Sequence, residues 1–195
     1  MRVLAVIAHP IATSTSGQLF YAAVTAMQKE GATVDILDLY QHADRIPFLT
    51  FPEPGKPFDS VFADVPFYWE NKERFMAADR LLIAYPVWWY APPAIMKAWI
   101  DLITNYAWQH RTGPYAQARH NIKKVFIINT ADMSWWHRFV GSCNSGTEMM
   151  KEACKYLGIG EIKTYQVNSA RTLTAQAKEK IAQKIAIISR RWLIQ

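Results

Sequence analysis

The sequence has few cysteines. Among its 195 residues there are only two, Cys143 and Cys154. On a single helix they would be roughly 16 Å apart at a rise of about 1.5 Å per residue, whereas a disulfide needs Cα atoms within about 7 Å. Their spacing also lacks the pattern of a metal site. We therefore expect two reduced, mostly buried thiols, no disulfide within such a helix and no bound metal.

Long hydrophobic runs are also missing. No apolar run reaches the roughly 18 residues that a membrane-spanning helix needs. The N-terminal MRVLAVIAHP lacks a small-residue cleavage site, so it predicts a first strand and not a signal peptide. Hydrophobic residues make up 51% of the chain, which excludes disorder. We expect a cytoplasmic protein in which residues 1–195 form a single domain, because no linker or repeat interrupts them.

Acidic residues are in the minority, with 16 Asp and Glu against 22 Lys and Arg and a formal net charge of +6. The basic excess is concentrated between Lys178 and Arg191. Such a face could bind nucleic acid, but a basic patch alone is a weak signal. We favour a solvated helix face and expect no nucleic-acid partner.

Apolar periodicity predicts strands and helices in strict alternation. The expected strands are residues 3–8, 32–40, 80–85, 123–129 and 161–167. The expected helices are residues 19–30, 70–78, 92–105, 147–157 and 174–192. Residues 41–69 have no period and read as a long surface excursion. This order is typical of an α/β fold in which helices cover both faces of a parallel sheet.

The segment after the first strand, AHPIATSTSGQLF, is rich in hydroxyl groups. It matches neither G-x-x-x-x-G-K-[ST] nor G-x-G-x-x-G. Hydroxyls and backbone N–H groups at the start of a helix nevertheless suit an anion such as a phosphate monoester. An ordinary helix N-cap would need only one of these hydroxyls. The residues alone leave both interpretations open.

The segment after the third strand, YPVWWYAPPAIMKAWID, places three aromatic residues in an expected loop. Exposed aromatic residues in a row are unusual unless something covers them. A planar ring system lying on the loop would explain them. A hydrophobic plug under a neighbouring loop, or a dimer interface, would do so as well.

Together these two segments resemble the flavodoxin-like NAD(P)H quinone oxidoreductase family, which includes quinone reductases, modulator proteins and potassium-efflux ancillary flavoproteins. The second segment carries the more specific matches: Pro86, Trp88, Trp89, Tyr90, Pro93, Ala94, Ile95, Lys97, Trp99, Ile100 and Asp101. The resemblance implies a doubly wound five-stranded sheet of order 2-1-3-4-5, a bound flavin, and a homodimer with its active site at the subunit junction. We expect FMN, with FAD as the alternative, because the chain is short.

The resemblance also assigns site residues. It gives the flavin phosphate to His9, Ser14, Thr15, Ser16 and Gln18. It gives the isoalloxazine ring to Pro86, Val87, Trp88, Trp89 and Tyr90. After the fourth strand the family often has Thr-Thr-Gly-Gly, where this chain has Asn129, Thr130, Ala131 and Asp132. Ala131 fits if its φ is negative, and we expect Asp132 to point away, since a carboxylate would oppose charge developing on the reduced ring.

The expected reaction is hydride transfer from NADH or NADPH to a quinone-type acceptor, with ping-pong kinetics because donor and acceptor share one site. His137 is the candidate proton donor, unless it is a surface or packing histidine. Tyr106 and Trp108 resemble an aromatic wall that the partner subunit contributes; a plain interface cluster is the alternative. We expect the apolar helix at residues 95–103 to contribute to the dimer interface.

Two other functions compete with the enzyme. An electron-carrier flavodoxin is usually acidic, which disfavours it for this basic chain. A regulatory subunit that resembles the potassium-efflux ancillary proteins and docks on a membrane transporter is the more serious alternative. The basic last helix would then be its docking face.

Overall fold

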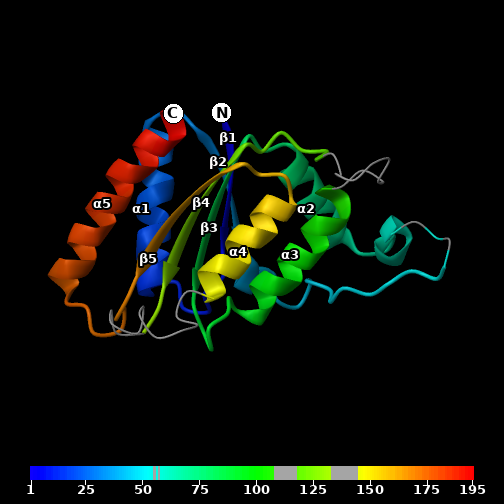
Figure 1. The fold of residues 1–195 in the computed structure, drawn as a ribbon, viewed down its shortest axis with the longest axis horizontal. Helices are drawn as coiled ribbons and strands as arrows, with labels where there is room; N and C mark the ends of the chain where they lie inside the picture. Colours follow the sequence, from blue (N-terminus) through cyan, green and yellow to red (C-terminus); the bar gives the residue numbers. More distant parts are fainter. Residues whose placement is uncertain (55, 57, 108–117, 133–144) are drawn as a thin grey trace.

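The computed structural model describes residues 1–54, 56, 58–107, 118–132 and 145–195 (Figure 1). Its five strands form one parallel sheet in the order β2-β1-β3-β4-β5, which confirms the predicted topology. The strands are β1 (Arg2–Ile7), β2 (Thr33–Asp38), β3 (Arg80–Pro86), β4 (Lys124–Thr130) and β5 (Glu161–Val167).

Helices cover both faces of the sheet, with α1 and α5 on one face and α2, α3 and α4 on the other (Figure 1). They are α1 (Thr15–Lys29), α2 (Pro66–Met76), α3 (Ala94–Ala107), α4 (Ser145–Tyr156) and α5 (Ala175–Ile194). Two 3₁₀ helices, η1 (Leu39–His42) and η2 (Phe58–Phe62), lie in the excursion between β2 and α2.

The central strands are buried on both faces, which explains their unbroken apolar runs. In β1, Val3 and Ala5 pack in the cluster under α1 and α5, whereas Leu4 and Val6 pack in the opposite cluster with α2, α3 and α4. This alternation follows from the two-residue period of a strand. The sheet is therefore a rigid frame for the loops at its edge.

Helix α3 differs from the prediction. Trp99 and Ile103 are fully buried in the core of this chain, and the indole Nε1 of Trp99 donates to Asn71 Oδ1 at 3.1 Å. Met96 and Ile100 join the same cluster. These side chains fill the space between α3 and the sheet and are not available to a dimer interface. That other residues of this helix contribute to such an interface stays a prediction.

Several elements begin or end away from their predicted limits because of local capping. Helix α1 starts at Thr15, since Ser14 Oγ accepts a hydrogen bond from Gly17 N–H at 3.1 Å. Helix α2 starts at Pro66, a residue well suited to a first helical turn. Strand β2 ends at Asp38, whose carboxylate accepts from Tyr40 N–H at 3.0 Å and starts η1.

Cys154 is a buried free thiol, and burial raises its pKa to about 12. Cys143 lies outside the described residues. Within the described ranges, no helix combines the length and the apolar character that crossing a bilayer requires.

His120 holds the segment before β4 against the end of α4. Its Nδ1 accepts from Ile122 N–H at 3.2 Å, so its Nε2–H donates to the Leu157 carbonyl at 2.8 Å. Its ring also meets Phe75 edge-on at 5.1 Å. Burial lowers the pKa of His120 below the ordinary value of about 6.5 for a histidine, which keeps the folded imidazole neutral near pH 7.

We expect the free energy of unfolding to fall as pH drops below 6.5, because the unfolded chain then binds a proton that folded His120 refuses. Each such histidine contributes at most about 1.4 kcal/mol per pH unit. The free energy of unfolding, measured by urea denaturation between pH 8 and pH 5, should depend less steeply on pH in His120→Gln than in wild type. His9, whose pKa burial also lowers, should contribute to the pH dependence that remains. An unchanged slope would contradict this assignment.

Candidate functional site

A cavity of about 630 Å³ opens where the carboxyl ends of β1, β3 and β4 meet. This size is typical of small-molecule sites. The parallel register places Ile7 beside Ala84 and Pro86 beside Thr130, so the loops after these strands share one edge. The cavity is lined by His9, Ile11, Thr13, Ser14, Thr15, Ser16, Pro86, Val87, Trp88, Trp89, Thr130, Ala131, Asp132, Ala170, Arg171 and Lys178.

The first turn of α1 forms one wall of the cavity. Ser14 is the N-cap, which confirms the capping role, and its hydroxyl keeps a hydrogen to donate. Ser16 is almost fully buried, and its Oγ lies 2.7 Å from Thr130 Oγ1. Thr15 Oγ1 donates to the Ala170 carbonyl at 3.4 Å. Hydroxyls therefore join this turn to the ends of β4 and β5, and the positive end of the helix dipole lies at the cavity.

Gly17 is required by a close backbone approach. A Cβ atom at this position would lie 2.2 Å from the Ala12 carbonyl oxygen. The loop after β1 folds back against the helix start at a distance that only glycine permits. This contact explains the glycine that follows the hydroxyl run.

His9 is a hydrogen-bond donor at the cavity, not a fixed charge. Its Nδ1 accepts from Ile11 N–H at 3.0 Å, which leaves the proton on Nε2. Burial is the largest cause that lowers its pKa. Its ring meets the edge of Trp88, with centroids 6.1 Å apart. His9 thus connects the hydroxyl-rich turn to the aromatic loop.

Two cavity cations were not predicted, Arg171 in the loop after β5 and Lys178 near the start of α5. Arg171 binds Asp132 twice: its backbone N–H donates to Oδ1 at 2.9 Å, and its guanidinium Nε lies 2.7 Å from Oδ2. Asp132 lines the cavity with its charge compensated. The two cations against one carboxylate leave the cavity suited to an anion. The sequence does contain a cue to both cations: they follow the fifth strand, which ends at the same edge of the sheet as the cavity.

The end of β4 accommodates alanine where glycine was expected. Of the described non-glycine residues, only Trp89, Tyr90 and Ser169 have positive φ, so Ala131 meets the condition set for it. Its N–H donates to the Val167 carbonyl at 2.8 Å, and its carbonyl accepts from Ala170 N–H at 3.1 Å. These bonds continue the pairing of β4 with β5 into the loop.

The aromatic loop is a two-residue turn. Trp88 and Ala91 exchange backbone hydrogen bonds of 2.8 and 3.0 Å. Between them, Trp89 and Tyr90 have φ of 51° and 64°, the signature of a type I′ turn. Bulky residues in this conformation cost roughly 1–3 kcal/mol each. Trp89 is 95% exposed, so the turn is no plug beneath a described loop.

Three predicted residues lie outside the cavity lining. Gln18 is exposed, and its Nε2 donates to the Thr13 carbonyl at 3.0 Å. Asn129 is fully buried beneath the edge, and Tyr90 is half exposed beside it. His137 and Trp108 lie outside the described residues, and only the backbone of Tyr106, in α3, is described.

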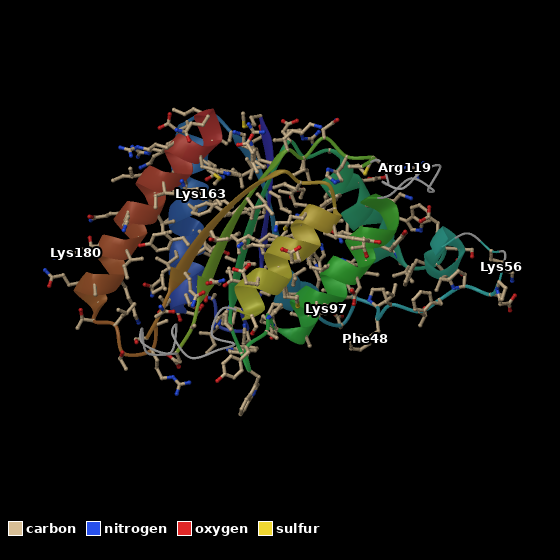
Figure 2. All side chains as sticks on the ribbon, viewed as in Figure 1. Phe48, Lys56, Lys97, Arg119, Lys163 and Lys180 are labelled. Atoms are coloured by element: carbon tan, nitrogen blue, oxygen red, sulfur yellow. The ribbon has the colours of Figure 1, made fainter. Side chains whose placement is uncertain are left out.

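The basic residues of α5 are partly used within the fold. Lys178 lines the cavity, Lys184 Nζ lies 5.4 Å from the ring centroid of Tyr165, and Arg190 lies 3.6 Å from Glu30. Lys180 instead projects from the outer side of the helix (Figure 2). The charge run therefore divides between the site, the sheet and solvent.

Comparison with known proteins confirms the resemblance seen in the sequence. A family model described as a flavodoxin-like fold matches residues 1–191. The chain belongs to this family. A protein from Streptococcus mutans shares the fold with a TM-score of 0.82 and 27% identity, over 98% of this chain and all of the other.

Two further proteins carry functional names. NAD(P)H dehydrogenase [quinone] 1 from Rattus norvegicus is 30% identical over 66% of this chain and 53% of its own length. An FMN-dependent NADH-azoreductase from Bacillus anthracis, in complex with FMN, superposes with a TM-score of 0.76 at 15% identity, over 97% of this chain and 98% of the other. The chain spans about half the length of the curated relatives it matches first.

We expect Gly17→Ala to destabilise the protein by about 1–3 kcal/mol, because the added Cβ must displace the Ala12 carbonyl. At an open helical position the same change would stabilise by roughly 0.5–1 kcal/mol. Gly160→Ala is the matched control, since nothing lies within 4 Å of its added Cβ. Urea denaturation measures both; a Gly17→Ala protein as stable as Gly160→Ala would contradict the close approach.

Proposed function

We propose that this protein is a flavin-dependent NAD(P)H oxidoreductase that binds FMN in the cavity at the edge of its sheet. One observation carries the proposal: an anion-suited helix start and a rigid aromatic turn line the same cavity. A molecule with a phosphate at one end and a planar ring system at the other matches both walls. The whole chain would then act as one flavin-binding domain.

The donors present fit a phosphate group. The Ser14 hydroxyl, the first-turn amides of α1 and the Nε2–H of His9 would donate to it. Thr15 would donate as well once its hydroxyl releases the 3.4 Å bond to the Ala170 carbonyl. Lys178 would balance its charge, while Arg171 remains occupied by Asp132. Ser16 would act indirectly, because the hydrogen bond between its hydroxyl and that of Thr130 fixes the position of Thr130.

The aromatic turn fits the ring system. Residues 86–89 line the cavity, and Val87 N–H already donates to the Thr130 carbonyl at 2.7 Å. That bond ties the loop to β4, so the remaining backbone groups and the Trp88 ring would meet a ligand in a fixed place. Bound FMN would supply the redox chemistry, taking up and giving back a hydride.

The names of the relatives support the donor and the acceptor. They favour NADH or NADPH as the source of hydride and a quinone as the acceptor, exchanged at one site with ping-pong kinetics. The chain's own part is to bind and orient the reactants and to exclude water. In a homodimer, Tyr106 and Trp108 of a second copy would cover the ring, and His137 would supply a proton to the reduced quinone.

FMN is preferred to FAD, and the FMN complex of the structural neighbour supports this choice. We do not propose transporter docking as a second function, because Lys178, Lys184 and Arg190 already have positions within the fold.

The proposal is tested by releasing the flavin from the purified protein with denaturant and identifying it by mass. NADH and NADPH oxidation is then followed at several quinone concentrations. We expect FMN, and parallel lines in double-reciprocal plots. A protein that neither contains nor takes up FMN would refute the proposal.

Ser14→Ala should weaken FMN binding at least tenfold, because a hydrogen bond to a charged group contributes about 1.5–3 kcal/mol. Binding of riboflavin, which lacks the phosphate, should change less than threefold. Thr174→Ala is the control for helix capping, since Thr174 Oγ1 caps α5 as Ser14 caps α1. Fluorescence titration of the flavin-free protein measures both affinities. An equal loss of affinity for FMN and for riboflavin would show that Ser14 only caps the helix and does not bind the phosphate.

A further inference from the structure

The first turn of α4 packs directly on the aromatic turn. Ser145 Oγ donates to the Tyr90 carbonyl at 2.5 Å. A Cβ atom on Gly146 would lie 3.2 Å from the same carbonyl oxygen and 3.2 Å from Val87 Cγ1. The helix backbone thus presses against both ends of the turn. We call residues 145–147 the α4 clamp.

Buried polar bonds fix the α4 clamp to the sheet. Asn129 Nδ2 donates to Thr147 Oγ1 at 2.6 Å, and Thr147 Oγ1 donates to Gln166 Oε1 at 2.9 Å. Tyr85 Oη donates to the Gly146 carbonyl at 3.1 Å. Asn129 and Tyr85 are fully buried and Thr147 nearly so. In such surroundings these bonds are strong and costly to break, so β3, β4 and β5 jointly hold the start of α4.

The aromatic turn needs such support from outside. Trp89 and Tyr90 both have positive φ, although neither is glycine, asparagine or aspartate. Trp89 is almost entirely exposed, so its own side chain contributes little packing within the chain. A conformation of this kind persists only where surrounding structure determines it. The Tyr90 carbonyl, held by Ser145, is where that constraint is applied.

We propose that the α4 clamp positions the aromatic turn to receive the flavin ring, with Ser145 and Thr147 as positioning residues and Asn129 as their anchor. This inference rests on the proposed function. It divides the site into two separately supported halves: the α1 turn for the phosphate and the clamped turn for the ring. Loss of the clamp should therefore weaken ring binding without affecting recognition of the phosphate.

The test compares riboflavin and FMN affinities of Ser145→Ala and Thr147→Val by fluorescence titration. Valine keeps the shape of threonine and removes the hydroxyl that joins Asn129 to Gln166. We expect the affinity of both variants to fall about tenfold for riboflavin and for FMN alike. A substitution in the phosphate half, such as Ser14→Ala, should instead weaken FMN much more than riboflavin. Ser189→Ala is the control, because it removes a buried hydroxyl that bonds within α5; it should change neither affinity.

A second measurement needs no flavin. In the flavin-free protein, hydrogen exchange at Ala91 N–H reports the turn, because this amide donates to the Trp88 carbonyl. Both clamp variants should exchange there at least tenfold faster than wild type and than Ser189→Ala. Wild-type exchange in both variants would overturn the clamp itself. Faster exchange with unchanged riboflavin affinity would overturn its role in ring binding, and wild type that binds no flavin would refute the proposed function.

Discussion

The parallel register of β1, β3 and β4 is the constraint on which the site depends. It aligns the carboxyl ends of three strands that are far apart in the sequence, with Ile7 beside Ala84 and Pro86 beside Thr130. The buried contact between the Ser16 and Thr130 hydroxyls then joins the first helix to the fourth strand. A hydroxyl-rich turn, an aromatic turn and a charged loop are thereby brought to a single cavity.

Each wall of the cavity has its own support. The helix start is shaped by a backbone approach that only Gly17 permits, and the left-handed aromatic turn is held by hydrogen bonds and close packing from α4. The charges at the cavity are also partly paired. Asp132 forms an ion pair with Arg171, which leaves Lys178 as the cation for an incoming anion. Such preorganisation favours ligand binding because little must be ordered when the ligand arrives.

The strands could be predicted from apolar runs and alternation along the chain, whereas their order in the sheet was implied by the family resemblance and is confirmed by the structure. That the segments after the first, third and fourth strands share one cavity could be predicted from the strand ends, whereas the individual residues were assigned by the resemblance. The apolar stripe with Trp99 and Ile103 could not be assigned, because core and interface require the same pattern. Lys178 could not be assigned to the site, because it begins a run of basic residues that is equally typical of a solvated helix face. The network of Asn129 and Thr147 depends on how distant segments pack, which periodicity does not encode.

The central claim is that one cavity holds a phosphate and a planar ring at separate walls. Backbone NMR titration of the flavin-free protein tests this most directly, with inorganic phosphate and lumiflavin as separate probes. Phosphate should shift the amides of residues 14–17 and lumiflavin those of residues 87–91, and FMN should shift both sets with higher affinity than either. Shifts that fall outside both segments, or both probes acting on the same segment, would contradict the account.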